Sequence, residues 1–454
     1  MTEQNQTARG NWNSKLGFVL AAAGSAVGLG NIWGFPTQVA DNGGAAFILI
    51  YLGCCFLVGF PVMVAELTIG RNTGKNPIGA FRELGGDRWA PLIGVWGVLC
   101  GVMILSFYLV LSGWTLGYVL EEIFYYFGAD GTASLMGDLE YGPKNAVLSL
   151  LFMVMTVVII TGGVSQGIER ATKLLMPLLL LILGAMILYM FTQDGAFDGL
   201  ALYLKPDFST LSPTLFFSAL GQAFFSLSLG MGALITYGSY INKDQNLVES
   251  AVFVTLADLG IAFFAGLLIV PAMFVAQAGG TAIFDPETGA LFSSVTLVFD
   301  VLPELFHQIG GLTGMLLGVL FFVLLGMAAL TSSISLLEVP VAWLIDEHNY
   351  SRKRAAWIIG GAVSIVSIVI SFDTGLIDFF VVIFNEIGLP LGGFMICLFL
   401  AYVWKTDQAL LEIEQGYPGV TTNWFGRIWP WFMRMICPLL IGLILITIAV
   451  NIFS

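Results

Sequence analysis

Two glycine pairs interrupt long apolar segments of this chain. The first pair is Gly28 and Gly30, and the second pair is Gly230 and Gly232. In hydrocarbon, an unwound backbone leaves N–H and C=O groups without partners, so a break is tolerated only where it lines a polar cavity. Matching breaks in the two halves of a membrane protein predict a solute site between two structural repeats.

Polar side chains are sparse in the apolar segments, and nearly all of them offer oxygen. They are Asn31, Glu66, Tyr108, Ser226, Ser228, Asp258, Thr331, Ser332, Glu338 and Asp378. Intramembrane carboxylates are costly and usually mark the path of an ion or substrate. Carbonyl, amide, hydroxyl and carboxylate oxygens suit a hard cation such as Na⁺, and the N-terminal ends of half-helices favour an anionic group. The pattern therefore predicts cotransport of Na⁺ with a solute that carries a carboxylate.

Each polar residue also has a purely structural interpretation. A single Ser or Thr in a spanning helix usually donates to the preceding turn. For Glu66, a hydrogen bond to the broken segments explains the residue as well as a direct functional role. Asp258 in an apolar stretch is harder to explain structurally, and Thr331 with Ser332, beside the small Ala328, can present two oxygens to a neighbouring backbone.

The composition identifies an all-α integral membrane protein. Of 454 residues, 57% are hydrophobic and 10% are charged, against roughly 25% charged residues in soluble domains. A bilayer crossing needs about 20 apolar residues, and eleven such segments are expected. They are 16–40, 45–70, 91–127, 145–163, 168–191, 214–240, 248–277, 312–345, 354–372, 376–404 and 430–453.

The basic residues predict the orientation in the membrane. With a cytoplasmic N-terminus, only Lys144 and Lys205 of the 17 Lys and Arg fall outside, as basic residues are held on the cytoplasmic side. Eleven spans of the cell (inner) membrane then place the C-terminus on the external side. Acids near the outer ends, such as Glu121 and Glu122, are interpreted as a solvated face, so neither a nucleic acid nor an obligatory protein partner is expected.

Catalysis is not expected. His307 and His348 are the two histidines, and neither belongs to a metal-ligand or nucleophile pattern. The five cysteines lie in or beside apolar segments and are interpreted as small hydrophobic residues rather than disulfides. The glycine-rich stretch 24–34 follows no strand and lacks an acid about 20 residues further on, so it is not a dinucleotide-binding loop.

Five colinear motifs carry a resemblance to a known family. They are GSAVGLGNIW at 24–33, SGWTLG at 112–117, GIER at 167–170, FFSLSLG at 224–230 and LTSS at 330–333. Through them the chain resembles the neurotransmitter:sodium symporter family, specifically its bacterial amino-acid branch. The resemblance implies one transporter domain over 1–454 with a LeuT-type fold, in which a five-plus-five inverted repeat has its first and sixth spans broken. The first repeat would cover about 12–191 and the second about 214–404, and the last span, about 430–453, would be peripheral.

The resemblance also implies two sodium sites. The first would use the Ala26 carbonyl, Asn31, Ser226 and Asp258, together with the substrate carboxylate. The second would use the carbonyls of Gly24, Val27 and Ala328 and the hydroxyls of Thr331 and Ser332. The carboxylate of Asp258 would supply the negative charge that chloride supplies in animal relatives, so chloride is not expected as a cofactor.

The implied substrate pocket has a polar and an apolar end. Its residues would be Ala26, Gly28, Leu29, Gly30, Ile104, Tyr108, Phe225, Ser228, Met231, Ser332 and Leu336. Monoamine-carrying relatives place an aspartate where Gly28 stands, and a glycine leaves room for the carboxylate of the ligand itself, with Tyr108 as a hydroxyl donor. An α-amino acid with a hydrophobic or aromatic side chain is therefore expected.

The gates implied by the resemblance differ between the two sides. The inner gate would use Arg9, Trp12, Tyr240 and Asp346, and Gly167 with Pro177 would let the fifth span unwind. On the outer side, relatives pair a basic residue with an acid of the tenth span. Here Gly34 replaces the basic residue and Asp378 keeps the acid, so closure would depend on Tyr108 and Phe225.

Two alternatives stay open. The solute could be a zwitterionic osmolyte or a γ-amino acid, or the chain could be an amino-acid receptor that does not transport.

Overall fold

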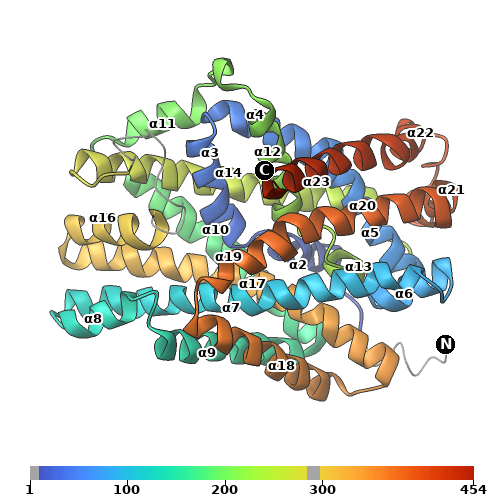
Figure 1. Ribbon diagram of the computed structural model, residues 1–454, viewed down its shortest axis with the longest axis horizontal. Coiled ribbons are helices and arrows are strands. Elements are labelled where there is room, and N and C mark those ends of the chain that lie inside the picture. Colours follow the sequence, from blue (N-terminus) through green and yellow to red (C-terminus); the bar gives the residue numbers. More distant parts are fainter. Residues whose placement is uncertain (1–9, 284–296, 454) are drawn as a thin grey trace.

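The computed structural model describes residues 10–283 and 297–453, without the side chains of residues 210 and 451–453. The described residues form helices joined by turns. Figure 1 shows that the long helices run mostly along the longest axis of the molecule. Helices α8 (Asp130–Gly137), α11 (Ala196–Leu204) and α16 (Leu302–Ile309) lie at one end, and α6 (Pro77–Gly85) and α21 (Thr406–Glu414) lie at the other.

The remaining elements follow the expected order of spans. In the first half they are α2 (Lys15–Ala26), η1 (Gly30–Gly34), α3 (Phe35–Asp41), α4 (Ala45–Cys54), η2 (Cys55–Gly59), α5 (Phe60–Thr73), α7 (Ala90–Tyr126), α9 (Gly142–Thr161), η3 (Val164–Glu169) and α10 (Arg170–Met190). In the second half they are η4 (Phe208–Thr210), α12 (Pro213–Ser226), α13 (Ala233–Gly238), α14 (Leu247–Ala278), η5 (Leu297–Val301), α17 (Gly311–His348), α18 (Arg352–Phe372), α19 (Leu376–Phe380), η6 (Val381–Ile387), α20 (Gly388–Leu398), η7 (Phe399–Trp404), α22 (Trp424–Trp431), η8 (Phe432–Ile436) and α23 (Cys437–Phe453).

Ten of the eleven expected segments have a counterpart among the apolar spans of the described residues. Within the described residues, nine helical stretches are long and apolar enough to cross a membrane, and the bent pair 15–26 and 30–41 adds a tenth. The expected sixth segment, 214–240, is divided into α12 and α13, which have 14 and 6 residues and are each too short to cross alone. The last span begins at Trp424, earlier than expected.

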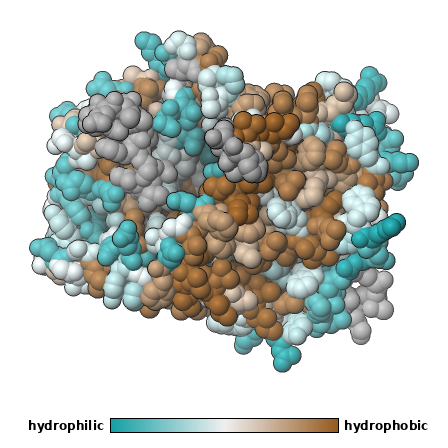
Figure 2. Space-filling view, viewed as in Figure 1, coloured by the Kyte–Doolittle hydropathy of each residue, from teal (hydrophilic) through white to brown (hydrophobic). Residues whose placement is uncertain are grey.

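The outer surface of the bundle fits a lipid environment. Large apolar side chains such as Leu181, Leu188 and Ile365 are at least two-thirds exposed. Figure 2 shows hydrophobic residues over the central part of the face and hydrophilic residues toward both ends of the long axis. An apolar band of this kind between two polar ends is the surface that a bilayer requires.

The two broken spans are enclosed by the long helices. Helix α2 packs against α10, α14 and α17, and α7 packs along α17. The two longest helices, α7 and α17, have 37 and 38 residues. They flank the breaks, so side chains of α17 reach the first break and those of α7 reach the space between both breaks.

Two expectations about polar and sulfur-containing residues have clear outcomes. All five cysteines are buried and free, as predicted.

The interpretation of Glu121 and Glu122 as part of a solvated face is wrong, because these residues are only 8% and 1% exposed. The last turns of α7 are covered by α8 and α16, which the sequence pattern alone does not place there.

Candidate functional site

The backbone groups of the first break are hydrogen-bonded by side chains from both halves of the chain. Helix α2 ends at Ala26, and the chain bends by 58° before η1. The Gly28 N–H donates to Oδ1 of Asn31 at 3.1 Å. This side-chain oxygen takes the place of the backbone carbonyl that would accept the bond in a continuous helix. The carbonyls of Ser25 and Val27 accept from hydroxyl groups of the second half of the chain. The break therefore displays carbonyl oxygens while its buried polar groups find partners.

The second break depends on positive backbone angles. Between α12 and α13, Ser228, Gly230 and Gly232 have φ values of 54°, 82° and 77°. The Gly230 N–H donates to Oε1 of Glu66 at 2.8 Å. The structural interpretation of Glu66 thus has a direct basis, since its carboxylate satisfies a backbone donor that unwinding leaves free.

Asn31, Ser226 and Asp258 meet between the breaks. Nδ2 of Asn31 donates to Oδ1 of Asp258 at 2.6 Å and to Oγ of Ser226 at 3.0 Å. Oγ of Ser226 donates to Oδ2 of Asp258 at 2.8 Å. The hydroxyl of Tyr51 lies 2.9 Å from the same Oγ. All four side chains are buried, at 1% exposure or less.

This cluster has the chemistry of a cation site. The carboxylate of Asp258 is fully buried and accepts only from neutral groups, and no salt bridge reaches it from the part of the chain that the structure describes. Burying an uncompensated charge is expensive. A monovalent cation beside the Asp258 and Ser226 oxygens would compensate it. The Asn31 nitrogen, not its oxygen, faces these two residues here, so its amide would have to turn to supply the predicted oxygen ligand.

A second group of oxygens joins α17 to the first break. Oγ1 of Thr331 lies 3.4 Å from the Val27 carbonyl and 2.9 Å from the Ala328 carbonyl. Oγ of Ser332 lies 3.3 Å from the Val27 carbonyl. A Cβ added to Gly24 would lie 3.2 Å from Cβ of Thr331, so α2 and α17 approach closely here. The residues predicted for the second sodium site are thus neighbours in space.

A cavity of about 30 Å³ lies between the two breaks. Its lining comprises Ser25, Ala26, Gly28, Leu29, Gly30, Asn31, Ile104, Tyr108, Phe225, Ser226, Ser228, Met231, Ser332, Ser335 and Leu336. The structure therefore brings all eleven predicted pocket residues around a single space. This free space is well below that of ligand pockets, roughly 300–1,000 Å³, so lining side chains must move apart to admit a small organic ligand.

The cavity has a polar end at the first break. The Leu29 N–H donates to the Tyr108 hydroxyl at 3.0 Å. A Cβ added to Gly28 would lie 2.6 Å from Oγ of Ser332 and 2.8 Å from the Tyr108 hydroxyl. Glycine leaves the space between these hydroxyl groups free, whereas a side chain would fill it. At the other end, Ile104, Met231 and Leu336 are apolar and buried.

On the side nearest α6, the predicted gate residues form tight contacts. Nε1 of Trp12 donates to the Tyr237 carbonyl at 3.1 Å, and the Tyr240 hydroxyl donates to Oε1 of Glu338 at 2.6 Å. Oδ2 of Asp346 accepts from the N–H and Nδ2 of Asn76. The predicted partner Arg9 lies outside the described residues. These contacts join the chain before α2 to the end of α13, and α6 to α17.

The start of the fifth span is helical. Gly167 lies in the π-helical segment η3, and Pro177 lies inside α10. A Cβ at Gly167 would lie 2.1 Å from the Ile159 carbonyl, so only glycine fits. The carboxylate of Glu169, two residues later, accepts from the Asn13 N–H at 2.8 Å and ties this segment to the chain before α2.

On the opposite side, two side chains of α12 contact the first break. The Phe225 ring covers Gly30, where an added Cβ would lie 2.3 Å from Cε1 of the ring. Nε2 of Gln222 donates to the Gly30 carbonyl at 3.1 Å. Asp378, at the start of the tenth span, is exposed. Among the described residues, no hydrogen bond or ion pair joins Asp378 to the segment around Gly34.

Sequence reasoning missed two contributors to this region. Tyr51 resembles any aromatic residue in an apolar span, and Gln222 lies one turn before the second break without a motif around it. A polar residue on the same helix face as Ser226, four positions earlier, is the signal that points to Gln222. No comparable signal singles out Tyr51.

Comparisons with known proteins agree on one family. The model of the sodium:neurotransmitter symporter family matches residues 9–129 and 125–454. A sodium-dependent transporter of Bacillus subtilis, YhdH, is 34% identical over 473 residues, covering 99% of each chain. A sodium-dependent transporter of Haemophilus influenzae is 33% identical and covers 98% of this chain and 99% of its own.

A solved structure is also similar over nearly the whole length. The crystal structure of MhsT in complex with L-phenylalanine superposes with a TM-score of 0.83 at 40% identity, covering 97% of this chain and 100% of MhsT. The expected all-α membrane fold with broken first and sixth spans is confirmed. On these matches, the chain belongs to the sodium:neurotransmitter symporter family.

Proposed function

We propose that this sodium-dependent symporter imports an α-amino acid with a hydrophobic or aromatic side chain by alternating access. The observation that supports this most strongly is the single cavity between the breaks. One end of this cavity is lined by backbone and hydroxyl groups around Gly28 and Tyr108. The other end is lined by the apolar side chains of Ile104, Met231 and Leu336. A carboxylate suits the first end and an apolar side chain suits the second.

The similarity to MhsT supports the same substrate class. That protein was crystallised with L-phenylalanine, and its match covers nearly all of this chain. Met231 adds a flexible side chain to the apolar end, which favours several substrates of different shape over one.

Two sodium ions would couple transport to the ion gradient. The first ion would bind Asp258, Asn31, Ser226 and the Ala26 carbonyl, and the substrate carboxylate would complete its ligands. The second ion would bind the oxygens that join α17 to the first break. Because the ligands come from both α17 and the first break, sodium binding at this site would stabilise the conformational state in which these two elements stay in contact.

The experiment that tests the substrate class is a competition panel. The twenty amino acids, betaine and γ-aminobutyrate would each compete with labelled L-phenylalanine for binding to the purified protein in sodium. Displacement by Leu, Phe, Tyr or Trp and little displacement by charged amino acids is expected. Strong displacement by betaine or γ-aminobutyrate alone would favour the alternative substrates.

Transport is expected not to require chloride. Complete replacement of chloride by gluconate should leave the initial rate of sodium-driven uptake unchanged, because the buried carboxylate of Asp258 already supplies a fixed negative charge beside the first sodium site. The measurement is uptake into proteoliposomes in the two salts. Loss of uptake without chloride, with Asp258 intact, would show that this charge is not sufficient.

The outer gate is expected to depend little on charge. Asp378→Asn should reduce transport only slightly, because position 34 offers no basic side chain. Gly34→Arg should slow turnover modestly in a salt-dependent way, as paired accessible charges contribute about 0–1 kcal/mol. The backbone at Gly34 has room for a side chain, since the nearest atoms to an added Cβ belong to Gln222 at 3.9 Å.

Initial uptake rates and equilibrium binding for the two single variants and the double variant test the gate. Loss of substrate binding in Asp378→Asn alone would mean that Asp378 binds the substrate or has a cationic partner, contrary to this account.

The topology and repeats complete the proposal. With the N-terminus in the cytoplasm, α6 and α21 lie at the inner end and the C-terminus lies outside. The two repeats, about 12–191 and 214–404, would move against each other around the cavity. Separation of the contacts of Trp12, Tyr240 and Asp346, with Arg9, and unwinding between Gly167 and Pro177 would open the inner path.

A further inference from the structure

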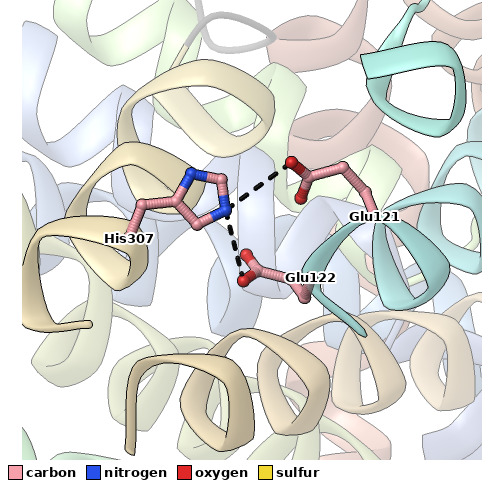
Figure 3. Close-up of side chains that lie close together, drawn as sticks. All are labelled: Glu121, Glu122 and His307. Atoms are coloured by element: carbon pink, nitrogen blue, oxygen red, sulfur yellow. Dashed lines mark ion pairs between the residues drawn. The ribbon is translucent and has the colours of Figure 1, made fainter. Parts of the chain in front are cut away.

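A histidine and two carboxylates converge far from the transport site. Figure 3 shows His307 of α16 pointing toward Glu121 and Glu122 at the end of α7. Nε2 of His307 lies 3.5 Å from Oε1 of Glu121 and 3.5 Å from Oε2 of Glu122. One ligand atom from each residue can be chosen so that all three lie within 4.8 Å of one another.

The polar atoms of this cluster lack ordinary partners. Nε2 of His307, Oε2 of Glu121 and Oε1 of Glu122 are buried and have no hydrogen-bond partner among the described residues. The side chain of Glu122 is 1% exposed and that of Glu121 is 10% exposed. Buried carboxylate and imidazole atoms without partners are costly unless something else binds them.

The cluster favours positive charge at one point. Two carboxylates lie 3.5 Å from Nε2 of His307, and the negative potential between them attracts a cation.

The spacing fits a tetrahedral metal ion better than a direct hydrogen bond. An N–H···O bond normally spans about 2.7–3.2 Å, so both 3.5 Å contacts of Nε2 are longer than an ordinary hydrogen bond. Ligand bonds of about 2.0–2.2 Å around zinc place neighbouring ligand atoms about 3.4 Å apart in a tetrahedron. One imidazole nitrogen with two carboxylate oxygens suits zinc, whereas calcium and magnesium prefer oxygen ligands alone.

The cluster is accessible to an ion and a water molecule. A cavity of about 210 Å³ adjoins it, lined among others by Glu122, Tyr125, His307 and Met315. The Tyr125 ring stacks on the imidazole with centroids 3.6 Å apart, which fixes the ring plane. A water molecule in the cavity would supply the fourth ligand of a site with three protein ligands.

We propose that Glu121, Glu122 and His307 bind one Zn²⁺ ion and thereby join the end of α7 to α16. The site lies with α8 and α16 at the end of the molecule opposite α6 and α21, separate from the transport cavity (Figure 1).

Zinc titration of the purified, chelator-treated protein by isothermal calorimetry tests the proposal. One Zn²⁺ per chain is expected to bind the wild type. His307→Ala and Glu122→Gln should each weaken binding by at least about tenfold, since even losing a supporting residue outside the ligand set typically costs 10–100-fold. His307→Cys should restore binding, because a thiolate is also a zinc ligand.

The matched control is His348→Ala. This other histidine is exposed at the end of α17, contacts the Trp343 ring, and should contribute nothing to zinc binding. Thermal unfolding of each variant checks that it is folded. Binding of Co²⁺ should also give the visible absorption of a four-coordinate site, which an ion pair without metal would not give.

The wild-type measurement alone can overturn the proposal. A wild type that binds no Zn²⁺ would show that the cluster is only an ion pair between α7 and α16. Equal zinc affinity in the wild type and His307→Ala, or loss of binding in His348→Ala, would place any bound zinc elsewhere.

Discussion

Replacing Thr331 and Ser332 together by alanine is expected to lower the sodium-dependent affinity for substrate by well over tenfold. The two hydroxyls lie 3.4 Å and 3.3 Å from the Val27 carbonyl and supply the side-chain oxygens of the proposed second sodium site. A buried site that loses two ligands loses most of its ion affinity, and each tenfold change corresponds to about 1.4 kcal/mol. The measurement is binding of labelled substrate as a function of sodium concentration.

Ser333→Ala is the matched control for the double variant. Ser333 is the next residue of α17 and equally buried, but its hydroxyl donates to the Ala329 carbonyl of its own helix. Its removal should leave the sodium dependence unchanged. If the folded double variant and Ser333→Ala showed the same sodium dependence as the wild type, the second site would have been assigned to the wrong residues.

Gly230→Ala is expected to prevent formation of the second break. Its φ of 82° is unfavourable for alanine, and an added Cβ would lie 2.2 Å from the Leu389 carbonyl and 3.0 Å from the Gly393 N. Both are backbone atoms of α20 and cannot turn aside. Backbone strain and overpacking each cost about 1–3 kcal/mol, so the variant should unfold at much lower temperature in detergent or fail to accumulate.

Gly221→Ala controls for the loss of a glycine. It lies in α12, where no atom comes within 4 Å of an added Cβ, and alanine favours a helix by up to about 1 kcal/mol. This variant should match or exceed the wild type in thermal unfolding temperature. A Gly230→Ala protein with wild-type stability and sodium-dependent binding would contradict the close packing of the second break on α20.

Much of the transport site is predictable from the sequence because its chemistry is expensive in a membrane. A buried Asp258, a glycine pair in each half and adjacent hydroxyls at 331 and 332 have few explanations in hydrocarbon. The lining of the cavity was implied by the resemblance to the symporter family, and the structure brings those eleven residues together. Their roles in binding stay predictions.

Contacts made by ordinary-looking residues are not predictable in the same way. Tyr51 reaches the Asp258 cluster only because α4 packs against α12 and positions its hydroxyl. His307 lies 185 residues from Glu122 along the chain, and no spacing rule links them. The burial of Glu121 and Glu122 was not predictable from the distribution of charges along the sequence. It results from tertiary packing, because α8 and α16 cover the end of α7.

Sodium-driven uptake of L-phenylalanine into proteoliposomes is the most direct test of the central claim. With sodium outside and potassium inside, the account predicts accumulation above the external concentration. The accumulated substrate should leak out when a sodium ionophore collapses the gradient. Equal uptake with potassium on both sides, or sodium-dependent binding with no accumulation at all, would contradict a sodium-coupled amino-acid symporter.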